Sequence, residues 1–379
     1  MEHIIYLDNS ATTKPCAAAI NRISQALQTN WGNPSSLHSL GVDAEILLNK
    51  ARETVANKIN SNPNEIIFTS CGTEANNLAI LSALHRKNRG NRVITTAIEH
   101  PSVLETVKRL EDEGFEVIRL SVDKNGIIDL KQLEQALNSK TVLVSIMLVN
   151  NEIGSIEPIS DVAKLIKDLA PNAFFHCDAV QAFCKIPINV KTLGVDLLSA
   201  SAHKIHGPKG IGFLYCKKGI NIKPLISGGG QEMNLRSGTE AMPAIAGLLG
   251  ALEEMPNPNN LTQNIAELNR YARELSEKCP FIEINSPKDA LPYILNISVM
   301  GYRSETMLHF LESKNIFVSS GSACAKGEAS YVLTAIGLNR ARSDSALRLS
   351  FSRQNTKEDI DLTFAAINEA ASKLRRFKI

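Results

Sequence analysis

Short runs of apolar residues alternate with longer amphipathic stretches over most of the chain. Residues 65–70 (EIIFTS), 92–98 (RVITTAI) and 141–149 (TVLVSIMLV) are such runs, and each precedes a stretch with helical periodicity. Apolar runs of this length without alternation are typical of strands that are buried on both faces, as in a parallel sheet. We therefore predict an α/β fold with a mainly parallel central sheet and helices on both of its faces.

The pattern changes at residues 253–264 (EEMPNPNNLTQN), which are rich in Pro and Asn. Such a composition is typical of a linker. Beyond it, the pattern predicts a helix over 264–278, further strands and helices, and a last helix from about Lys357. We predict a large domain over residues 15–255 and a smaller α+β domain formed by residues 1–14 and 256–379.

Composition and charge exclude several classes of protein. The 379 residues are 44% hydrophobic and 21% charged, with a net charge of +2, which does not favour nucleic acid or a membrane surface as a partner. The apolar runs are too short to span a bilayer, and the N-terminus lacks a signal-peptide pattern. The seven cysteines are irregularly spaced and form no C-x-x-C motif. We therefore expect reduced thiols in a cytoplasmic protein, without disulfides or a zinc site.

Polar residues follow the predicted strands at their ends, where open α/β sheets bind ligands. Gly72 and Thr73 come after the first run and open a predicted helix, whose free N–H groups would suit a phosphate. This segment matches neither of the two common nucleotide-binding motifs. His100 and Asn151 follow the next two strands of this pattern and are candidates for contacts with a ligand.

A carboxylate and a lysine follow two later apolar runs. Asp178 lies at the end of the run AFFHCDAV, and a buried carboxylate there needs a cationic or N–H partner. Lys204 lies at the end of VDLLSASAHK, and burying its ammonium group at the end of an apolar strand is costly. His203 and His206 lack further ligands at suitable spacing, so we predict no metal site. A phosphate cradle, a carboxylate for a ring nitrogen and a lysine that can form an imine together predict pyridoxal phosphate as the cofactor.

Cys324 lies in the segment SSGSACAKGEASYVL, residues 319–333, among small and polar neighbours. A core cysteine usually has branched apolar neighbours. Gly321 and Gly327 would let a loop over about residues 319–330 carry the thiol into a site and out again. We therefore predict that Cys324 is a nucleophile rather than an idle thiol.

Short blocks spread over nearly the whole chain resemble one family: YLDNSATT, GNPSSLH, TEANN, EHPSV, VNNEIG, HCDAVQ, SAHKIHGPKGIG, GGGQE, RSGT and SSGSAC. The sequence resembles the cysteine desulfurases of the NifS/IscS type. These belong to the class V aminotransferase group of the fold-type I pyridoxal-phosphate enzymes. The blocks around Lys204 and Cys324 are the most diagnostic.

The resemblance implies a cofactor site. Lys204 would bond to pyridoxal phosphate, His100 would stack on its ring and move protons, Asp178 would keep the ring nitrogen protonated, and Gln181 would contact the phenolic oxygen. The phosphate would be bound by Gly72, Thr73, Ser201 and His203, and by Thr239 of the partner subunit in a homodimer.

The resemblance also implies the reaction. L-Cysteine would be converted to L-alanine, with the sulfur kept as a persulfide on Cys324. Arg348 would bind the substrate carboxylate with the help of Asn33, and Asn151 would lie beside the substrate and the ring. The sulfur would pass to an acceptor protein, either an iron–sulfur scaffold or an enzyme of tRNA or cofactor thiolation.

Three alternatives stay open at this point. The first is a selenocysteine lyase. The second is another class V aminotransferase-type enzyme in which Cys324 is incidental, and the third is a catalytically silent scaffold protein that has kept the fold. Only AKGEAS separates Cys324 from Tyr331, a shorter segment than in the best-known desulfurases, and this leaves the sulfur acceptor undefined.

Overall fold

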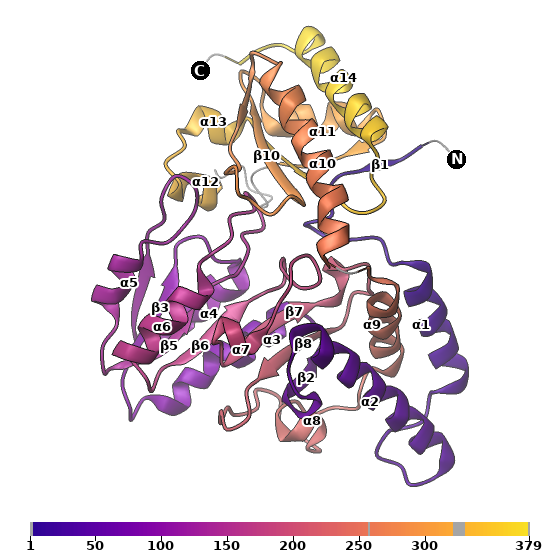
Figure 1. Ribbon diagram of the computed structural model, residues 1–379, viewed down its shortest axis with the longest axis vertical. Coiled ribbons are helices and arrows are strands. Elements are labelled where there is room, and N and C mark those ends of the chain that lie inside the picture. The colour runs from indigo at the N-terminus through magenta and orange to yellow at the C-terminus, as the bar shows by residue number, and fades with distance from the viewer. Residues whose placement is uncertain (1–2, 257, 321–329, 378–379) are drawn as a thin grey trace.

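A seven-stranded sheet forms the centre of the part of the chain that the structure describes, residues 3–256, 258–320 and 330–377 of a computed structural model (Figure 1). Strands β7, β6, β5, β3 and β4 are parallel, and β8 runs antiparallel between β7 and β2. The prediction of a mainly parallel α/β fold is therefore confirmed. In their order across the sheet, the strands are β2 (Ile66–Thr69), β8 (Gly212–Cys216), β7 (Leu197–Ser201), β6 (Phe174–Asp178), β5 (Thr141–Ser145), β3 (Arg92–Thr96) and β4 (Glu116–Leu120).

Helices bury both faces of this sheet. Val93 and Leu197 pack into one apolar cluster, and the adjacent Ile94 and Leu198 pack into another, because successive side chains of a strand point to opposite faces. One cluster contains residues of α3 (Gly72–Leu81) and α4 (Pro101–Asp112). The other contains residues of α2 (Ser39–Ile59), α5 (Leu130–Ala136), α6 (Ile159–Leu169) and α9 (Met242–Glu254).

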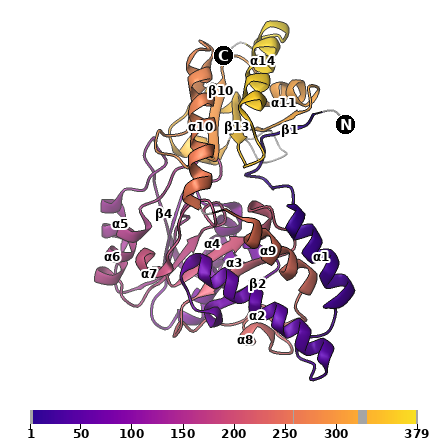
Figure 2. The ribbon, with the colours of Figure 1, turned by 45° about the vertical axis from the view of Figure 1, so that its right-hand side comes forward.

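A second, four-stranded antiparallel sheet is also present in the described residues. Its strands are, in order, β12 (Ser319–Ser320), β13 (Ala346–Ser350), β10 (Ile294–Val299) and β9 (Ile282–Ile284). Both views show α10 and α14 grouped with β10, apart from the strands of the larger sheet (Figures 1 and 2). The helices of this part are α10 (Pro258–Glu277), α11 (Ser304–Glu312), α12 (Tyr331–Ala335), α13 (Arg340–Asp344) and α14 (Lys357–Lys373).

The N-terminal strand lies in this second part. Strand β1 (Ile5–Tyr6) pairs in parallel with β11 (Ile316–Phe317). The limits of the two predicted domains stay a prediction. Helix α10 begins at Pro258 rather than at residue 264, because proline is well tolerated in the first turn of a helix, where its missing N–H has no partner to lose. The remaining elements are α1 (Ala17–Thr29), α7 (Val190–Leu193), α8 (Gln231–Asn234) and the 3₁₀ turns Pro63–Glu65, Ser82–Arg86 and Ala202–Lys204.

Helices α1 and α9 pack closely because Gly250 has no side chain. A Cβ atom at Gly250 would lie 2.5 Å from the backbone oxygen of Ala18. We expect Gly250→Ala to lower the free energy of unfolding by about 1–3 kcal/mol, because the two helices must separate. Urea unfolding measures this change. Ser24→Ala, on the exposed side of α1, should leave the free energy unchanged, and an equally stable Gly250→Ala variant would contradict the close approach.

No helix among the described residues is long and apolar enough to cross a membrane. The same residues contain no group of three or more His, Cys, Asp or Glu side chains that could hold a metal ion.

Candidate active site

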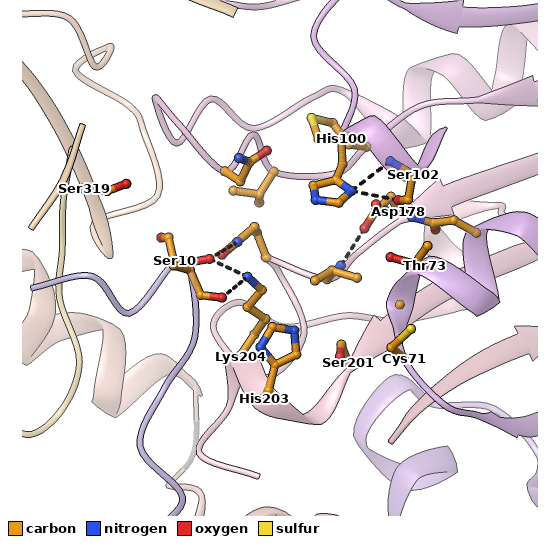
Figure 3. A pocket seen from close by; sticks show the side chains of 18 of the residues that line it. Ser10, Cys71, Thr73, His100, Ser102, Asp178, Ser201, His203, Lys204 and Ser319 are labelled. Atoms are coloured by element: carbon orange, nitrogen blue, oxygen red, sulfur yellow. Dashed lines mark hydrogen bonds between the residues drawn. The ribbon is translucent and has the colours of Figure 1, made fainter. Parts of the chain in front are cut away.

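A cavity of about 460 Å³ lies at the carboxyl ends of the central parallel strands (Figure 3). Strand ends meet there because β3, β5, β6 and β7 run in the same direction. The structure brings most of the predicted site residues to this cavity. They are Gly72, Thr73, His100, Asn151, Asp178, Gln181, Ser201, His203, Lys204 and Arg348.

The N-terminus of α3 forms one wall of the cavity. Gly72 and Thr73 occupy its first turn, where N–H groups have no partner within the helix. A Cβ atom at Gly72 would lie 2.7 Å from Cγ2 of Val180, so this close approach requires glycine. The hydroxyl of Ser201 on the facing strand is buried and has no hydrogen-bond partner in the described part of the chain. An unpaired hydroxyl beside a helix N-terminus suits a phosphate group.

Asp178 lies at the end of β6 and is held by two donors. The side-chain amide of Asn76 donates to Oδ2 at 2.7 Å, and the backbone N–H of Val180 donates to Oδ1 at 2.9 Å. Asp178 is only 4% exposed, so these donors offset the cost of burying its charge. A carboxylate held in this way can accept a hydrogen bond from a protonated ring nitrogen.

Asn76 connects Asp178 to His100. Its amide group also donates to Oγ of Ser102 at 2.8 Å, and that hydroxyl lies 2.8 Å from Nδ1 of His100. The backbone N–H of Ser102 donates to the same nitrogen at 3.1 Å. Because Nδ1 accepts, a neutral His100 ring carries its proton on Nε2. Burial lowers the pKa of His100 and Lys204 lowers it further, against the opposing effect of Asp178.

Lys204 ends the 3₁₀ turn that follows β7. Its Nζ atom donates to the backbone oxygens of Ser10 at 2.5 Å and of Ala11 at 2.7 Å. Burial lowers the pKa of Lys204 to about 8, and Arg348 contributes to this shift while Asp8 and Asp178 oppose it. The lysine is therefore an amine that loses its proton more readily than an exposed lysine, in contact with the cavity.

His203 and Gln181 complete the wall near Lys204. Burial, followed by the nearby Lys204, lowers the pKa of His203 to about 4, so that its ring is neutral at neutral pH. The side-chain amide of Gln181 donates to the backbone oxygen of Ser10 at 2.9 Å. Ser10 therefore accepts from both Gln181 and Lys204 and holds the two side chains beside each other.

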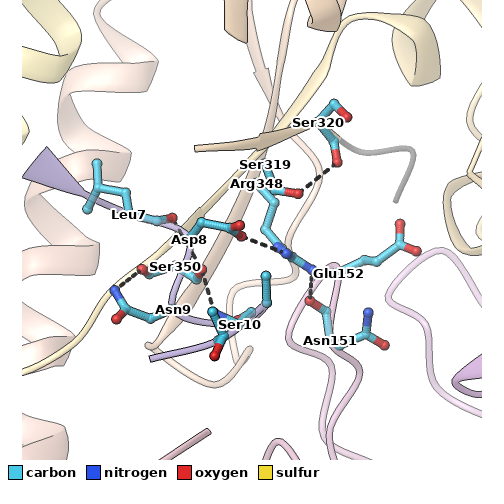
Figure 4. A network of polar contacts seen from close by, with 12 residues as sticks. Leu7, Asp8, Asn9, Ser10, Asn151, Glu152, Ser319, Ser320, Arg348 and Ser350 are labelled. Atoms are coloured by element: carbon cyan, nitrogen blue, oxygen red, sulfur yellow. Dashed lines mark hydrogen bonds and ion pairs between the residues drawn. The ribbon is translucent and has the colours of Figure 1, made fainter. Parts of the chain in front are cut away.

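Arg348 reaches the cavity from β13 of the second sheet (Figure 4). Its Nη2 atom lies 2.9 Å from Oδ1 of Asp8, and its Nη1 atom donates to the backbone oxygen of Asn151 at 2.9 Å. Nε of Arg348 is buried and has no hydrogen-bond partner among the described residues. Oδ1 of Asn151 is also buried and also has no partner among them. A guanidinium with unused donor capacity at a cavity wall can bind a carboxylate.

Two predicted site residues lie outside this cavity, and a third, Cys324, is not among the described residues. Thr239 lines a separate cavity of about 230 Å³, and its reach into a partner subunit stays a prediction. Asn33 is exposed, and its Oδ1 atom accepts the N–H of Ser35 at 2.9 Å, so its contact with substrate also stays a prediction.

Sequence reasoning missed several residues that shape the site. Asp8 and Ser10 belong to YLDNSATT and Asn76 to TEANN, so both blocks were recognised without a role for these side chains. Glu152 was missed as well. Its Oε2 atom accepts the hydroxyl of Ser330 at 2.5 Å, and burial raises its pKa to about 7 against the effects of Ser330 and Arg348.

Comparisons with known proteins agree over nearly the full length. The family model for aminotransferase class-V matches residues 5–363. A cysteine desulfurase IscS of Clostridium botulinum is 42% identical, with 99% of this chain and 96% of that protein covered. A putative cysteine desulfurase IscS 1 of Bacillus subtilis is 41% identical, with 98% and 99% covered.

Solved structures give the same result. A NifS-like protein superimposes with a TM-score of 0.93 at 37% identity, covering 98% of this chain and 100% of that chain. A structure described as SspA in complex with cysteine superimposes with a TM-score of 0.83 at 34% identity, covering 93% and 100%.

Proposed function

This chain belongs to the class V aminotransferase family, and from that premise we propose that it is a cysteine desulfurase that depends on pyridoxal phosphate. The reaction converts L-cysteine to L-alanine and leaves the sulfur as a persulfide on Cys324. The observation that carries the proposal is the convergence of a helix N-terminus, the carboxylate of Asp178, the imidazole of His100 and the amine of Lys204 in one cavity.

The residues of the cavity fit the cofactor. The unpaired hydroxyl of Ser201 and the N-terminus of α3 would hold its phosphate, Asp178 would hold its ring nitrogen, and His100 would lie against its ring. Lys204 would hold it covalently. When bound, pyridoxal phosphate supplies an electron sink for the bonds at the α-carbon of an amino acid.

Arg348 would bind the substrate, and Lys204 would transfer its α-proton. Arg348 would bind the carboxylate of cysteine through its guanidinium, which fixes the position of the α-carbon. Lys204 would remove the α-proton and later return a proton, because a pKa of about 8 allows its amine to act as a base near neutral pH. The neutral His100, with its proton on Nε2, would donate a hydrogen bond within the cavity.

The two flanks of the segment with Cys324 support the role proposed for that residue. Ser319 lines the cavity and pairs with Arg348 across β12 and β13. On the other side, Ser330 caps α12 and donates to Glu152, the residue after Asn151. Ser319 and Ser330 therefore lie near Arg348 and Asn151, the residues proposed to contact the substrate, and the proposed role of Cys324 is attack of its thiolate on the sulfur of bound cysteine.

The proposal includes partners and location. We propose that the protein forms a homodimer, in which Thr239 of one subunit contributes to the cofactor site of the other. We also propose that the sulfur passes to an acceptor protein, either an iron–sulfur scaffold or a thiolation enzyme. We also propose a cytoplasmic location.

Product analysis tests the proposed activity. Purified protein loaded with pyridoxal phosphate is incubated with L-cysteine and a thiol reductant, and alanine and sulfide are measured together. We expect equal amounts of the two products, since each turnover releases one of each. Pyruvate in place of alanine, or no sulfide, would refute the proposal. A parallel assay with L-selenocysteine distinguishes a selenocysteine lyase, which would turn over selenocysteine and leave cysteine unused.

Arg348→Gln tests the substrate contact. We expect the KM for cysteine to rise about 100-fold, corresponding to the loss of one charge-assisted contact of about 2.7 kcal/mol, with a smaller change in kcat. Steady-state kinetics measures both constants. Arg340→Gln is the matched control, because the side chain of Arg340 is 85% exposed. An unchanged KM would exclude Arg348 from carboxylate binding.

A further inference from the structure

Lys185 is a buried lysine directly behind the wall of the cavity. It is 6% exposed, and its Nζ atom donates to Oε1 of Gln181 at 3.0 Å. Nζ also lies 5.6 Å from the centre of the Tyr293 ring. No carboxylate of the described residues forms an ion pair with Lys185. An ammonium in this position is costly, and the reaction described above does not use it.

The contact with Lys185 fixes the orientation of the Gln181 amide. Oε1 accepts from Lys185, and Nε2 donates to the backbone oxygen of Ser10 at 2.9 Å. Exchanging the two amide atoms would place an NH₂ group against the lysine and an oxygen against the carbonyl of Ser10. Both neighbours therefore enforce the same orientation. The second N–H of Nε2 remains for a ligand in the cavity, which Gln181 lines.

The surroundings of Lys185 are cationic. Burial, together with the nearby Lys204 and Arg348, lowers its pKa to about 7. The rings of His203 and His206 are near enough for Lys185 to lower their pKa values. Ser10 links this region to the site, because its carbonyl accepts from Gln181 and from Lys204. A donor on Gln181 and several nearby cations favour an anionic oxygen on a ligand at this wall.

We propose that Lys185 is a positioning residue that acts through Gln181, holding the amide so that an N–H donor faces an anionic ring oxygen of the ligand. The inference rests on the proposed function, in which that oxygen is the phenolic oxygen of pyridoxal phosphate. Lys185 thereby lowers the proton affinity of the cofactor when it is bonded to Lys204. Without Lys185, the carbonyl of Ser10 alone orients the amide of Gln181. The amide then presents its oxygen to the cavity for part of the time, and that oxygen repels an anion.

A spectroscopic titration of the holoenzyme tests the inference. The visible absorbance of the bound cofactor is recorded against pH for the wild type and for Lys185→Met, which removes the donor and keeps an unbranched chain. We expect the midpoint to rise by about one pH unit in the variant, because the N–H of Gln181 no longer donates steadily to the deprotonated ring oxygen. Lys191→Met, at an exposed lysine of α7, is the control and should leave the midpoint unchanged. A variant midpoint equal to that of the wild type overturns the inference.

A double substitution separates positioning from a simple effect of charge. In a Gln181→Leu background, Lys185→Met should no longer shift the midpoint, because the amide through which the lysine acts is absent. A full shift in that background overturns the inference. If Lys185→Met does not bind the cofactor, Lys185→Leu, which also lacks a donor, replaces it with the same expectations. A wild-type protein that never acquires colour refutes the proposed function and this inference together, whereas a coloured wild type with an unshifted variant refutes this inference alone.

Discussion

Lys204→Ala is expected to lower the turnover of cysteine at least about 1000-fold, because a positioned general base contributes about 100- to 10,000-fold and the covalent hold on the cofactor is lost as well. The carbonyls of Ser10 and Ala11 accept from the Nζ atom and hold it at the cavity. Alanine production from cysteine measures the loss. The visible absorbance of the protein should also change, because the cofactor is no longer bonded to a lysine.

Lys209→Ala is the control for this prediction. Lys209 is an exposed lysine of the same SAHKIHGPKG block and lies outside the cavity lining. Its substitution should leave both turnover and absorbance unchanged. Added methylamine should restore part of the activity of Lys204→Ala, because a small amine can occupy the vacated space and act as a base. Turnover within tenfold of the wild type would show that Lys204 is not the base.

The sequence was sufficient for residues at strand ends. Gly72, Asp178 and Lys204 each follow an apolar run, and parallel strands bring their carboxyl ends to one edge of the sheet. The periodicity that predicts the strands therefore also predicts which polar residues meet. The resemblance then supplied roles for His100 and Gln181, which the pattern alone left open.

The sequence pattern does not predict contacts between segments that are distant along the chain. Asp8 meets Arg348 because the N-terminal segment pairs with β11 and then bridges to Ser350 of β13. No local sequence pattern predicts these short parallel pairings. Asn76 reads as an ordinary polar residue of a helix, and its bridge from Asp178 to Ser102 depends on the packing of α3 beside α4.

Lys185 is a single side chain whose role the sequence pattern does not predict. In the sequence it follows Gln181 by four residues in QAFCK, a spacing that is common on any helical turn. Its burial, and the amide orientation that it fixes, appear only when Ser10 is placed on the other side of Gln181. Propensity and periodicity describe where a chain turns, not which atom of an amide faces a cavity.

Cys324→Ala is expected to lower the formation of alanine and sulfide from cysteine at least about 100-fold, because it removes the nucleophile that takes the sulfur. Binding of the cofactor should persist, since its proposed contacts come from Lys204, Asp178 and α3. The measurements are product formation and the absorbance of the holoenzyme before and after cysteine is added. Sulfur-labelled cysteine should mark the wild-type protein in a form that a reductant releases, and it should leave the variant unlabelled.

Two other thiols make this prediction specific. Cys279 is partly exposed on the described surface, and Cys279→Ala should change neither label nor turnover. Cys71 lines the cavity beside Gly72, so it is the described thiol with direct access to a bound substrate. If Cys71→Ala abolishes labelling while Cys324→Ala retains it, the thiol that accepts the sulfur is Cys71 and not Cys324. If Cys324→Ala forms alanine at the wild-type rate without any label, Cys324 is incidental, and another reaction of the class V family explains the site.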